Sequence, residues 1–122
     1  MQYFTFSKHS FTDYCNVTLK NGALISQRSL QGIYLMSDDV NGKISWIKGT
    51  SYAIWYSADI NFWLIGHYSE IGSRFAYIAA KNEFEGLTDK RNEWRYWNRT
   101  SWIDANINDI DIQCKGKLLN IF

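Results

Sequence analysis

The stretch that decides the fold lies at residues 92–102 and reads NEWRYWNRTSW. Side chains of a β-strand point alternately to the two faces of a sheet. The four residues WRYW therefore divide into two pairs, Trp94 with Tyr96 on one face and Arg95 with Trp97 on the other. The polar residues that follow predict a turn, and the stretch indicates a β-hairpin with aromatic side chains on both faces.

Short runs typical of β-strands recur along the rest of the chain. Asn41 and Gly42 form the dipeptide that most strongly indicates a two-residue hairpin turn. The regular spacing predicts an all-β fold, a small antiparallel β-sandwich or barrel with short hairpins. The expected strands cover residues 16–20, 32–36, 43–48, 51–57, 61–66, 93–97, 101–104 and 109–114.

The segment 69–81 admits two interpretations. Its apolar residues recur at helical spacing behind Ser69, a possible N-cap, which would give one short helix. Gly72 and the β-rich residues 74–78 instead favour a strand, which is our prediction. Residues 82–92 carry many charged side chains and are expected to form a solvated loop. The apolar residues at helical spacing are Ile71, Phe75, Ile78 and Ala79.

The bulk composition indicates one globular domain over residues 1–122. The chain has 122 residues, 46% hydrophobic and 20% charged, which is enough to bury a core without a metal. Its net charge of +1 with mixed signs argues against a nucleic-acid-binding protein, which needs a concentrated basic patch. No apolar run has the length of a membrane span.

Two cysteines and two Asn-x-Thr tripeptides indicate a secreted or cell-surface protein. Cys15 and Cys114 are far apart and outside any metal-binding spacing, so a disulfide is expected, with two free thiols in a cytosolic protein as the alternative. Asn16 and Asn98 match the N-glycosylation pattern. The first residues do not resemble a signal peptide, so either the chain shown is a trimmed form or it is intracellular.

A set of short motifs occurs in a fixed order along the chain: Gly32-x-Tyr34, Asn41-Gly42-Lys43, Trp46, Ile54-Trp55-Tyr56, Trp63-x-Ile65-Gly66, Trp94-x-Tyr96-Trp97, Trp102 and Cys114. This set resembles a poorly characterised extracellular β-rich repeat module of invertebrate and protist surface proteins. The resemblance covers residues 30–114 and implies a secreted module without established catalytic residues. Members often carry a proline before the late tryptophan strand, where this chain has none.

The aromatic strands supply the candidate ligand-binding residues. For a single tryptophan, packing in or beside the core is the usual role. A subset left on the surface would instead form a flat platform for a glycan or a protein, with polar neighbours that bind hydroxyl or amide groups. The candidates are Trp63, Trp94, Arg95, Tyr96, Trp97, Trp102 and Asp104.

No catalytic signature, cofactor motif or metal-ligand spacing occurs in the sequence, so we expect no enzyme, no cofactor and no metal. His9 and His67 have no partner that the sequence places beside them. Calcium binding by Asp104, Asp109 and Asp111 is the weaker interpretation, because Asp109 and Asp111 alternate with isoleucines as the polar face of a strand.

Both ends of the chain are apolar, and two roles remain open for them. They pair with each other inside the domain, or one adds a strand to a neighbouring copy. The sequence thus predicts a non-catalytic binding or adhesion module that contacts a glycan or a protein. The alternative is a structural subunit that assembles with copies of itself into a filament or coat. The residues that would join such copies are Tyr3, Phe4, Phe6, Leu118, Leu119, Ile121 and Phe122.

Overall fold

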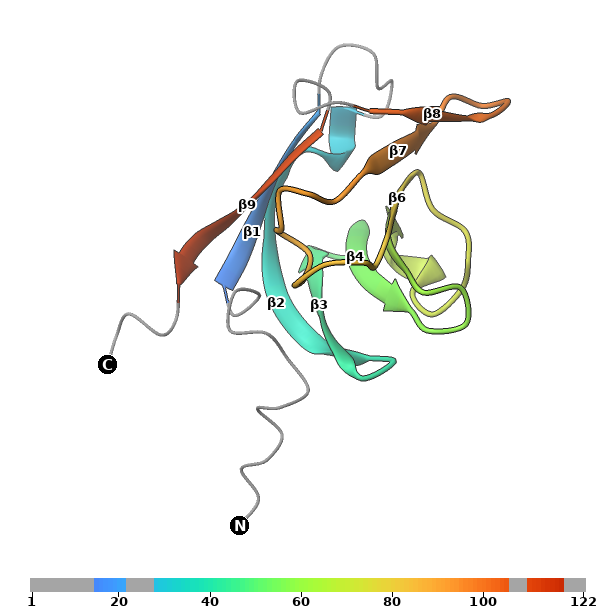
Figure 1. Ribbon diagram of the computed structural model, residues 1–122. Coiled ribbons are helices and arrows are strands. Elements are labelled where there is room, and N and C mark those ends of the chain that lie inside the picture. Colours follow the sequence, from blue (N-terminus) through green and yellow to red (C-terminus); the bar gives the residue numbers. More distant parts are fainter. Residues whose placement is uncertain (1–14, 22–27, 106–109, 118–122) are drawn as a thin grey trace.

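The computed structural model describes residues 15–21, 28–105 and 110–117, and these form one antiparallel sheet (Figure 1). The strand order is β8-β7-β6-β5-β4-β3-β2-β1-β9, so each strand from β1 to β8 lies beside the next one in the chain. The strands are β1 (Cys15–Asn21), β2 (Gly32–Val40), β3 (Lys43–Lys48), β4 (Tyr52–Ser57), β5 (Phe62–His67), β6 (Ile78–Lys81), β7 (Trp94–Trp97), β8 (Trp102–Asp104) and β9 (Ile110–Lys117).

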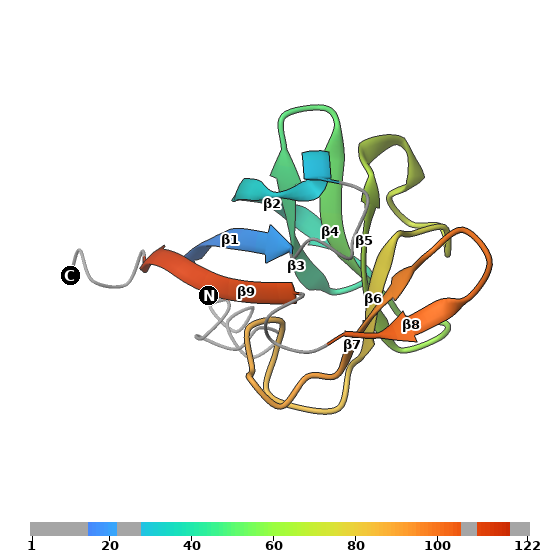
Figure 2. The same ribbon diagram turned by 90° about the horizontal axis from the view of Figure 1, so that it is seen from above.

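The sheet curls into a partly closed barrel, as the view from above shows (Figure 2). Its two edge strands, β8 and β9, follow each other in the chain, with Asp104 ending one and Ile110 beginning the other. Six residue steps span at most roughly 20 Å, whereas the outer strands of a flat nine-stranded sheet would lie about 38 Å apart. Chain connectivity therefore requires the curl. The prediction of an all-β antiparallel fold is confirmed, and the sheet forms a half-barrel.

The hairpin turns follow the local sequence. Asn41 and Gly42 have φ values of 56° and 86°, and they join Val40 to its cross-strand partner Lys43. This is the two-residue turn that the dipeptide predicts. No helix in the described ranges is long and apolar enough to cross a membrane; the helical turns there are η3 (Arg28–Leu30) and η4 (Tyr68–Glu70).

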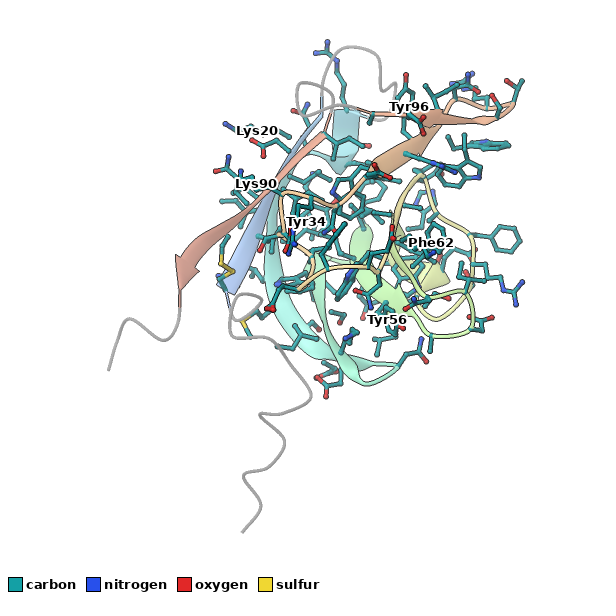
Figure 3. All side chains as sticks on the ribbon, in the orientation of Figure 1. Lys20, Tyr34, Tyr56, Phe62, Lys90 and Tyr96 are labelled. Atoms are coloured by element: carbon teal, nitrogen blue, oxygen red, sulfur yellow. A yellow bond between two sulfur atoms is a disulfide. The ribbon has the colours of Figure 1, made fainter. Side chains whose placement is uncertain are left out.

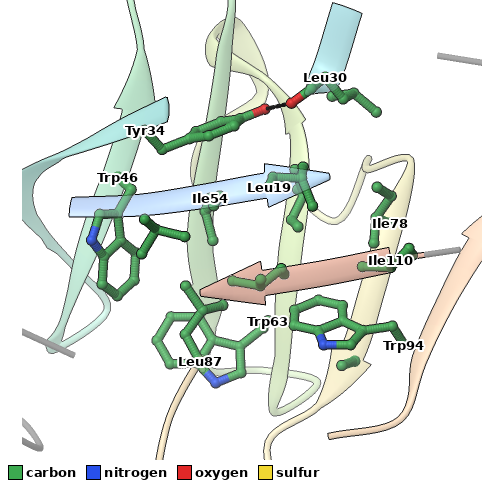
Figure 4. Close-up of a cluster of buried hydrophobic side chains, with 14 of the residues drawn as sticks. Leu19, Leu30, Tyr34, Trp46, Ile54, Trp63, Ile78, Leu87, Trp94 and Ile110 are labelled. Carbon is green, nitrogen blue, oxygen red and sulfur yellow. Dashed lines mark hydrogen bonds between the residues drawn. The ribbon is translucent and has the colours of Figure 1, made fainter. Parts of the chain in front are cut away.

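The main core fills the hollow of the curled sheet, where side chains crowd around the labelled Tyr34 (Figure 3). Trp46 and Trp63 are fully buried there with ring centroids 5.9 Å apart. The buried polar atoms of Tyr34 and Trp46 are satisfied by backbone: the Tyr34 hydroxyl donates to the Leu30 carbonyl at 2.6 Å (Figure 4), and Trp46 Nε1 donates to the Cys15 carbonyl at 2.8 Å.

The loop at residues 82–93 contributes to this core, which corrects the expectation of a solvated loop. Its Leu87 is fully buried and lies near Trp63 and Ile110 in the cluster of Figure 4. Asn92 holds the loop by donating from Nδ2 to the carbonyls of Gly86 and Leu87, at 2.8 and 3.0 Å. Most charged side chains of the loop are exposed, but the Asp89 side chain is only 12% exposed. Leu87 anchors the loop in the core.

Cys15 and Cys114 form a disulfide, as the sequence predicts. They lie on the neighbouring strands β1 and β9, with their Cα atoms 5.6 Å apart. The bridge joins residues 99 positions apart in sequence, so it ties the start of the described domain to its last strand. The terminal residues for which pairing or assembly is predicted, 3–6 and 118–122, lie outside the described residues.

Candidate aromatic binding surface

Three large aromatic side chains are exposed together on the outer face of the sheet. Phe75 is 74% exposed, Trp97 37% and Trp102 41%. Phe75 and Trp97 line two grooves together, and Trp102 contributes to one of them. We call Phe75, Trp97 and Trp102 the aromatic patch.

The β7–β8 hairpin places the two tryptophans. Along β7, burial alternates as the sequence predicts, with Trp94 and Tyr96 inward and Arg95 and Trp97 outward. Trp97 lies opposite Trp102 in the register of β7 and β8. Their rings meet edge to face with centroids 5.6 Å apart, a geometry that aromatic rings favour because of their quadrupoles. Each ring therefore supports the other in an exposed position.

The turn of this hairpin is held by one side chain. Asn98 Oδ1 accepts hydrogen bonds from the backbone N–H groups of Thr100 and Ser101, at 3.0 and 2.9 Å, and from the Thr100 hydroxyl at 3.0 Å. The Asn98 N–H donates to the Ser101 carbonyl at 3.1 Å. Asparagine is favoured in such turns because its side chain bonds the backbone just ahead of it.

Phe75 belongs to the segment 68–77, which folds over the outer face of the sheet. Ile71 and Ala76 of this segment pack against a second, smaller cluster that contains the buried Trp55. Trp55 Nε1 also donates to the Ser73 carbonyl at 3.3 Å. These contacts hold the segment flat against the sheet, and they leave Phe75 pointing away from it.

Two grooves run along the sides of Phe75. The first has a volume of about 430 Å³, and the second, which also borders Trp97, has a volume of about 310 Å³. Aromatic walls with polar ends are typical of sites that bind an amphipathic ligand. The first groove is lined by Arg74, Phe75, Ala76, Trp97 and Trp102, and the second by His67, Glu70, Phe75, Ala76, Tyr77 and Trp97.

Exposed ion pairs lie beside the patch. Arg95 Nε is 3.0 Å from Asp104 Oδ1 on the same face of the hairpin as the tryptophans. Arg74, which lines the first groove, is 2.8 Å from Asp59. Hydrogen bonds from Ser57 and then from Arg74 hold the pKa of Asp59 below its ordinary value. The surroundings therefore offer hydrogen-bond donors and acceptors without a net charge of one sign.

The structure separates the predicted ligand-binding residues into two groups. Trp63, Trp94 and Tyr96 are only 1%, 8% and 6% exposed and belong to the main core. These three residues are therefore excluded as ligand-binding residues, because a ligand cannot reach side chains that are buried in the core. The other four, Arg95, Trp97, Trp102 and Asp104, lie together on the outer face of the β7–β8 hairpin.

Phe75 and Arg74 were not predicted as site residues. Phe75 fits a helical spacing of apolar residues, which indicates a core position. The chain there is instead irregular: β6 takes only the last residues of the segment for which a strand is predicted, and the helical turn η4 stops at Glu70. Nothing in the local pattern marks Phe75 as exposed.

The remaining polar candidates have structural partners. His67 Nε2 is 2.7 Å from the Tyr77 hydroxyl, and its ring stacks on Tyr52. Asp104 pairs with Arg95, Asp111 accepts from Gln113, and Asp109 lies outside the described residues. Within the described part of the chain, no group of three or more His, Cys, Asp or Glu side chains could hold a metal ion.

Comparisons of the chain with models of protein families, with curated proteins and with solved structures found no match.

Proposed function

We propose that the domain is a non-catalytic binding or adhesion module that works outside the cell or at its surface. In this proposal the aromatic patch contacts a glycan or a protein, and the neighbouring ion pairs orient that ligand on the patch. The observation that carries the proposal is the joint exposure of Phe75, Trp97 and Trp102 around two grooves.

Exposed aromatic groups of this size support binding for an energetic reason. Apolar surface gains roughly 25 cal/mol for each Å² removed from water, and aromatic residues are over-represented among the residues that dominate binding energy. A single exposed apolar residue is ordinary, whereas a contiguous group beside a groove is typical of an interaction site. The Trp97–Trp102 pair also presents its rings in a fixed arrangement, so little side-chain entropy is lost when a ligand binds.

The polar neighbours suit a ligand that carries both apolar faces and hydrogen-bonding groups. Arg95 and Asp104 are respectively 56% and 88% exposed in their side chains. Their guanidinium and carboxylate groups can donate to and accept from hydroxyl or amide groups. A sugar ring and a peptide segment both have this combination, and a purely apolar ligand does not.

The disulfide supports the compartment named in the proposal. Disulfides persist in oxidising settings such as the cell exterior and are rare in the cytosol. The Cys15–Cys114 bridge closes almost the whole described domain. The resemblance to an extracellular repeat module points to the same compartment.

The test is a binding screen of the disulfide-bonded domain against an array of neutral and acidic oligosaccharides and an array of extracellular proteins. For each oligosaccharide or protein that binds the domain, the affinity is then measured for the parent and for the variants Phe75→Ala and Trp102→Ala. We expect each variant to lose at least about 10-fold in affinity, because truncation of a central aromatic contact typically costs more than 1 kcal/mol.

Ile33→Ala is the matched control, since Ile33 is a large apolar residue, 51% exposed, that lines neither groove. It should bind as the parent does. Equal binding by all three variants would contradict the proposal. Light scattering on the same samples tests the alternative of a self-assembling subunit, whose predicted contacts lie outside the described residues.

A further inference from the structure

We propose that Asn98 carries an N-linked glycan in the mature protein and that Asn16 stays unmodified. The sequence offers both residues as acceptors, in Asn16-Val17-Thr18 and Asn98-Arg99-Thr100. The structure distinguishes them by the backbone that surrounds each tripeptide. This inference goes beyond the proposed binding function. It also bears on that function, because a glycan at Asn98 would lie beside Trp97 and Trp102 and compete with a ligand for the aromatic patch.

A sugar attached at Asn98 would break none of the hydrogen bonds that hold the β7–β8 turn. It is exposed in the turn between β7 and β8, and all three hydrogen bonds of its side chain run to Oδ1. Its Nδ2, the atom that a glycan occupies, makes no hydrogen bond with any residue in the described ranges. The Thr100 hydroxyl is already oriented on the Asn98 amide at 3.0 Å. Attachment at Nδ2 would therefore leave every contact of the turn in place.

Asn16 lies in a different setting, within a strand that has neighbours on both sides. Its tripeptide belongs to β1, which pairs with β2 through Val17 and Thr18 and with β9 over its whole length. The side chain is half-buried, and its Oδ1 accepts from the Met36 N–H of β2 at 3.0 Å, just beyond Val17–Tyr34, where the backbone pairing of β1 with β2 ends. Asn16 also directly follows the disulfide-bonded Cys15.

The acceptor tripeptide of Asn16 cannot reach a transferase without opening two ladders of the sheet. A glycan added to Asn16 before folding would have to fit at this half-buried position, beside the Met36 backbone N–H that the Asn16 side chain contacts. Asn98, in contrast, sits in an exposed turn that can enter another protein's active site while the sheet stays intact.

The reaction needs a donor that the host supplies, an oligosaccharide linked to a polyisoprenyl diphosphate. Asn98 Nδ2 attacks the anomeric carbon of the first sugar, and the C1–N bond forms as the bond from C1 to the diphosphate oxygen breaks. Nδ2 loses one proton, and the polyisoprenyl diphosphate leaves with the bonding electron pair. No oxidation or reduction takes place, and the sugar ends beside Trp97 and Trp102, which flank the turn.

The test is to secrete the full chain from eukaryotic cells behind a removable signal peptide and to measure its intact mass before and after treatment with peptide N-glycosidase. We expect one glycan per chain, lost on treatment with a gain of about one dalton as Asn98 becomes aspartate. Site mapping by peptide mass spectrometry should place the glycan on Asn98 and find Asn16 bare.

Four variants test whether the glycan is attached to Asn98 and not to Asn16. Asn98→Asp removes Nδ2 but keeps an acceptor oxygen for the three turn hydrogen bonds, so it should fold and carry no glycan. Thr100→Ala should also be bare, whereas Thr100→Ser, which keeps the hydroxyl, should be modified. Thr18→Ala removes only the Asn16 tripeptide, so this variant should still carry the glycan on Asn98. A bare parent chain, or a glycan that disappears in Thr18→Ala, would overturn the proposal.

Discussion

Gly66 of β5 lies so close to Ala76 that a Cβ atom at position 66 would stand 3.0 Å from the Ala76 Cα. The same Cβ would be 3.2 Å from the Phe75 carbonyl oxygen. This approach lets the segment 68–77 lie flat on the outer face of the sheet. Because Gly66 has no side chain, the segment can approach the sheet closely at this point, and this approach positions Phe75, the most exposed residue of the aromatic patch.

We expect Gly66→Ala to destabilise the domain by about 1–3 kcal/mol, the usual range for overpacking. Replacing glycine with alanine gains about 0.4–1 kcal/mol through the unfolded chain, but here the added methyl meets backbone, which cannot rotate away. Chemical denaturation measures the loss. Amide hydrogen exchange should show faster exchange in residues 68–77.

Gly42→Ala is the control for this variant. Gly42 has a φ of 86° and nothing within 4 Å of its would-be Cβ, so alanine there is strained but meets no neighbour. It should lower stability without changing exchange in residues 68–77. Unchanged exchange in Gly66→Ala would show that the close approach does not position Phe75.

Trp94 and Trp97 are three residues apart, but truncation of Trp94 should destabilise the domain much more than truncation of Trp97. Trp94→Ala removes a side chain that is 8% exposed in the main core, so we expect a loss of about 3–5 kcal/mol in the free energy of unfolding. Trp97→Ala loses mainly the ring contact with Trp102, which is worth about 0.5–1.5 kcal/mol. Urea denaturation of both variants checks this, and comparable losses would mean that Trp97 is a core residue.

The local sequence pattern predicts the strands well because each depends on short-range chemistry. Asn41 and Gly42 adopt positive φ values that asparagine and glycine tolerate, so their turn follows from two residues. The alternation in WRYW likewise predicts which residues of β7 share a face. The disulfide prediction is confirmed as well, since only two cysteines are present to pair.

The choice of which face is buried does not follow from such patterns. Trp63 and Trp97 both occur in short aromatic runs typical of strands, yet the first lies in the hollow of the sheet and the second on its outer face. The curl of nine strands and the segment over Trp55 decide this, and both result from contacts between residues distant in sequence. The exposure of Phe75 and the burial of Leu87 do not follow from the local sequence for the same reason.

Removing the disulfide should weaken the domain more than any surface substitution. The bridge closes a loop with a sequence separation of 99, for which the chain-entropy model gives up to about 4.7 kcal/mol. We expect the double variant Cys15→Ala, Cys114→Ala to lose about 2–5 kcal/mol in the free energy of unfolding. Thermal and urea denaturation measure it, with Ile33→Ala as a surface control. A loss below about 1 kcal/mol would show that the unfolded chain gains little freedom.

Asp89 should make the stability of the 82–93 loop depend on pH. Its carboxylate accepts from Arg91 Nε and Nη2 at 3.0 and 2.8 Å and from the Arg91 backbone N–H at 2.9 Å. These hydrogen bonds hold the pKa of Asp89 well below its ordinary value of 3.8. A carboxylate whose pKa is lowered by folding stabilises the folded state above the unfolded pKa. That stability is lost as the pH falls from the unfolded pKa through the folded one.

We therefore expect Asp89→Asn to be less stable than the parent at pH 7, with a difference that shrinks below about pH 4 as the Asp89 carboxylate is protonated in the unfolded parent chain. Urea denaturation of both proteins between pH 7 and pH 2.5 measures this difference. Asp104→Asn is the control, because the Asp104–Arg95 pair is exposed and such pairs contribute at most about 1 kcal/mol. If the difference for Asp89→Asn stays constant across the range, the carboxylate charge does not hold the loop, and Leu87 and the hydrogen bonds of Asn92 hold it instead.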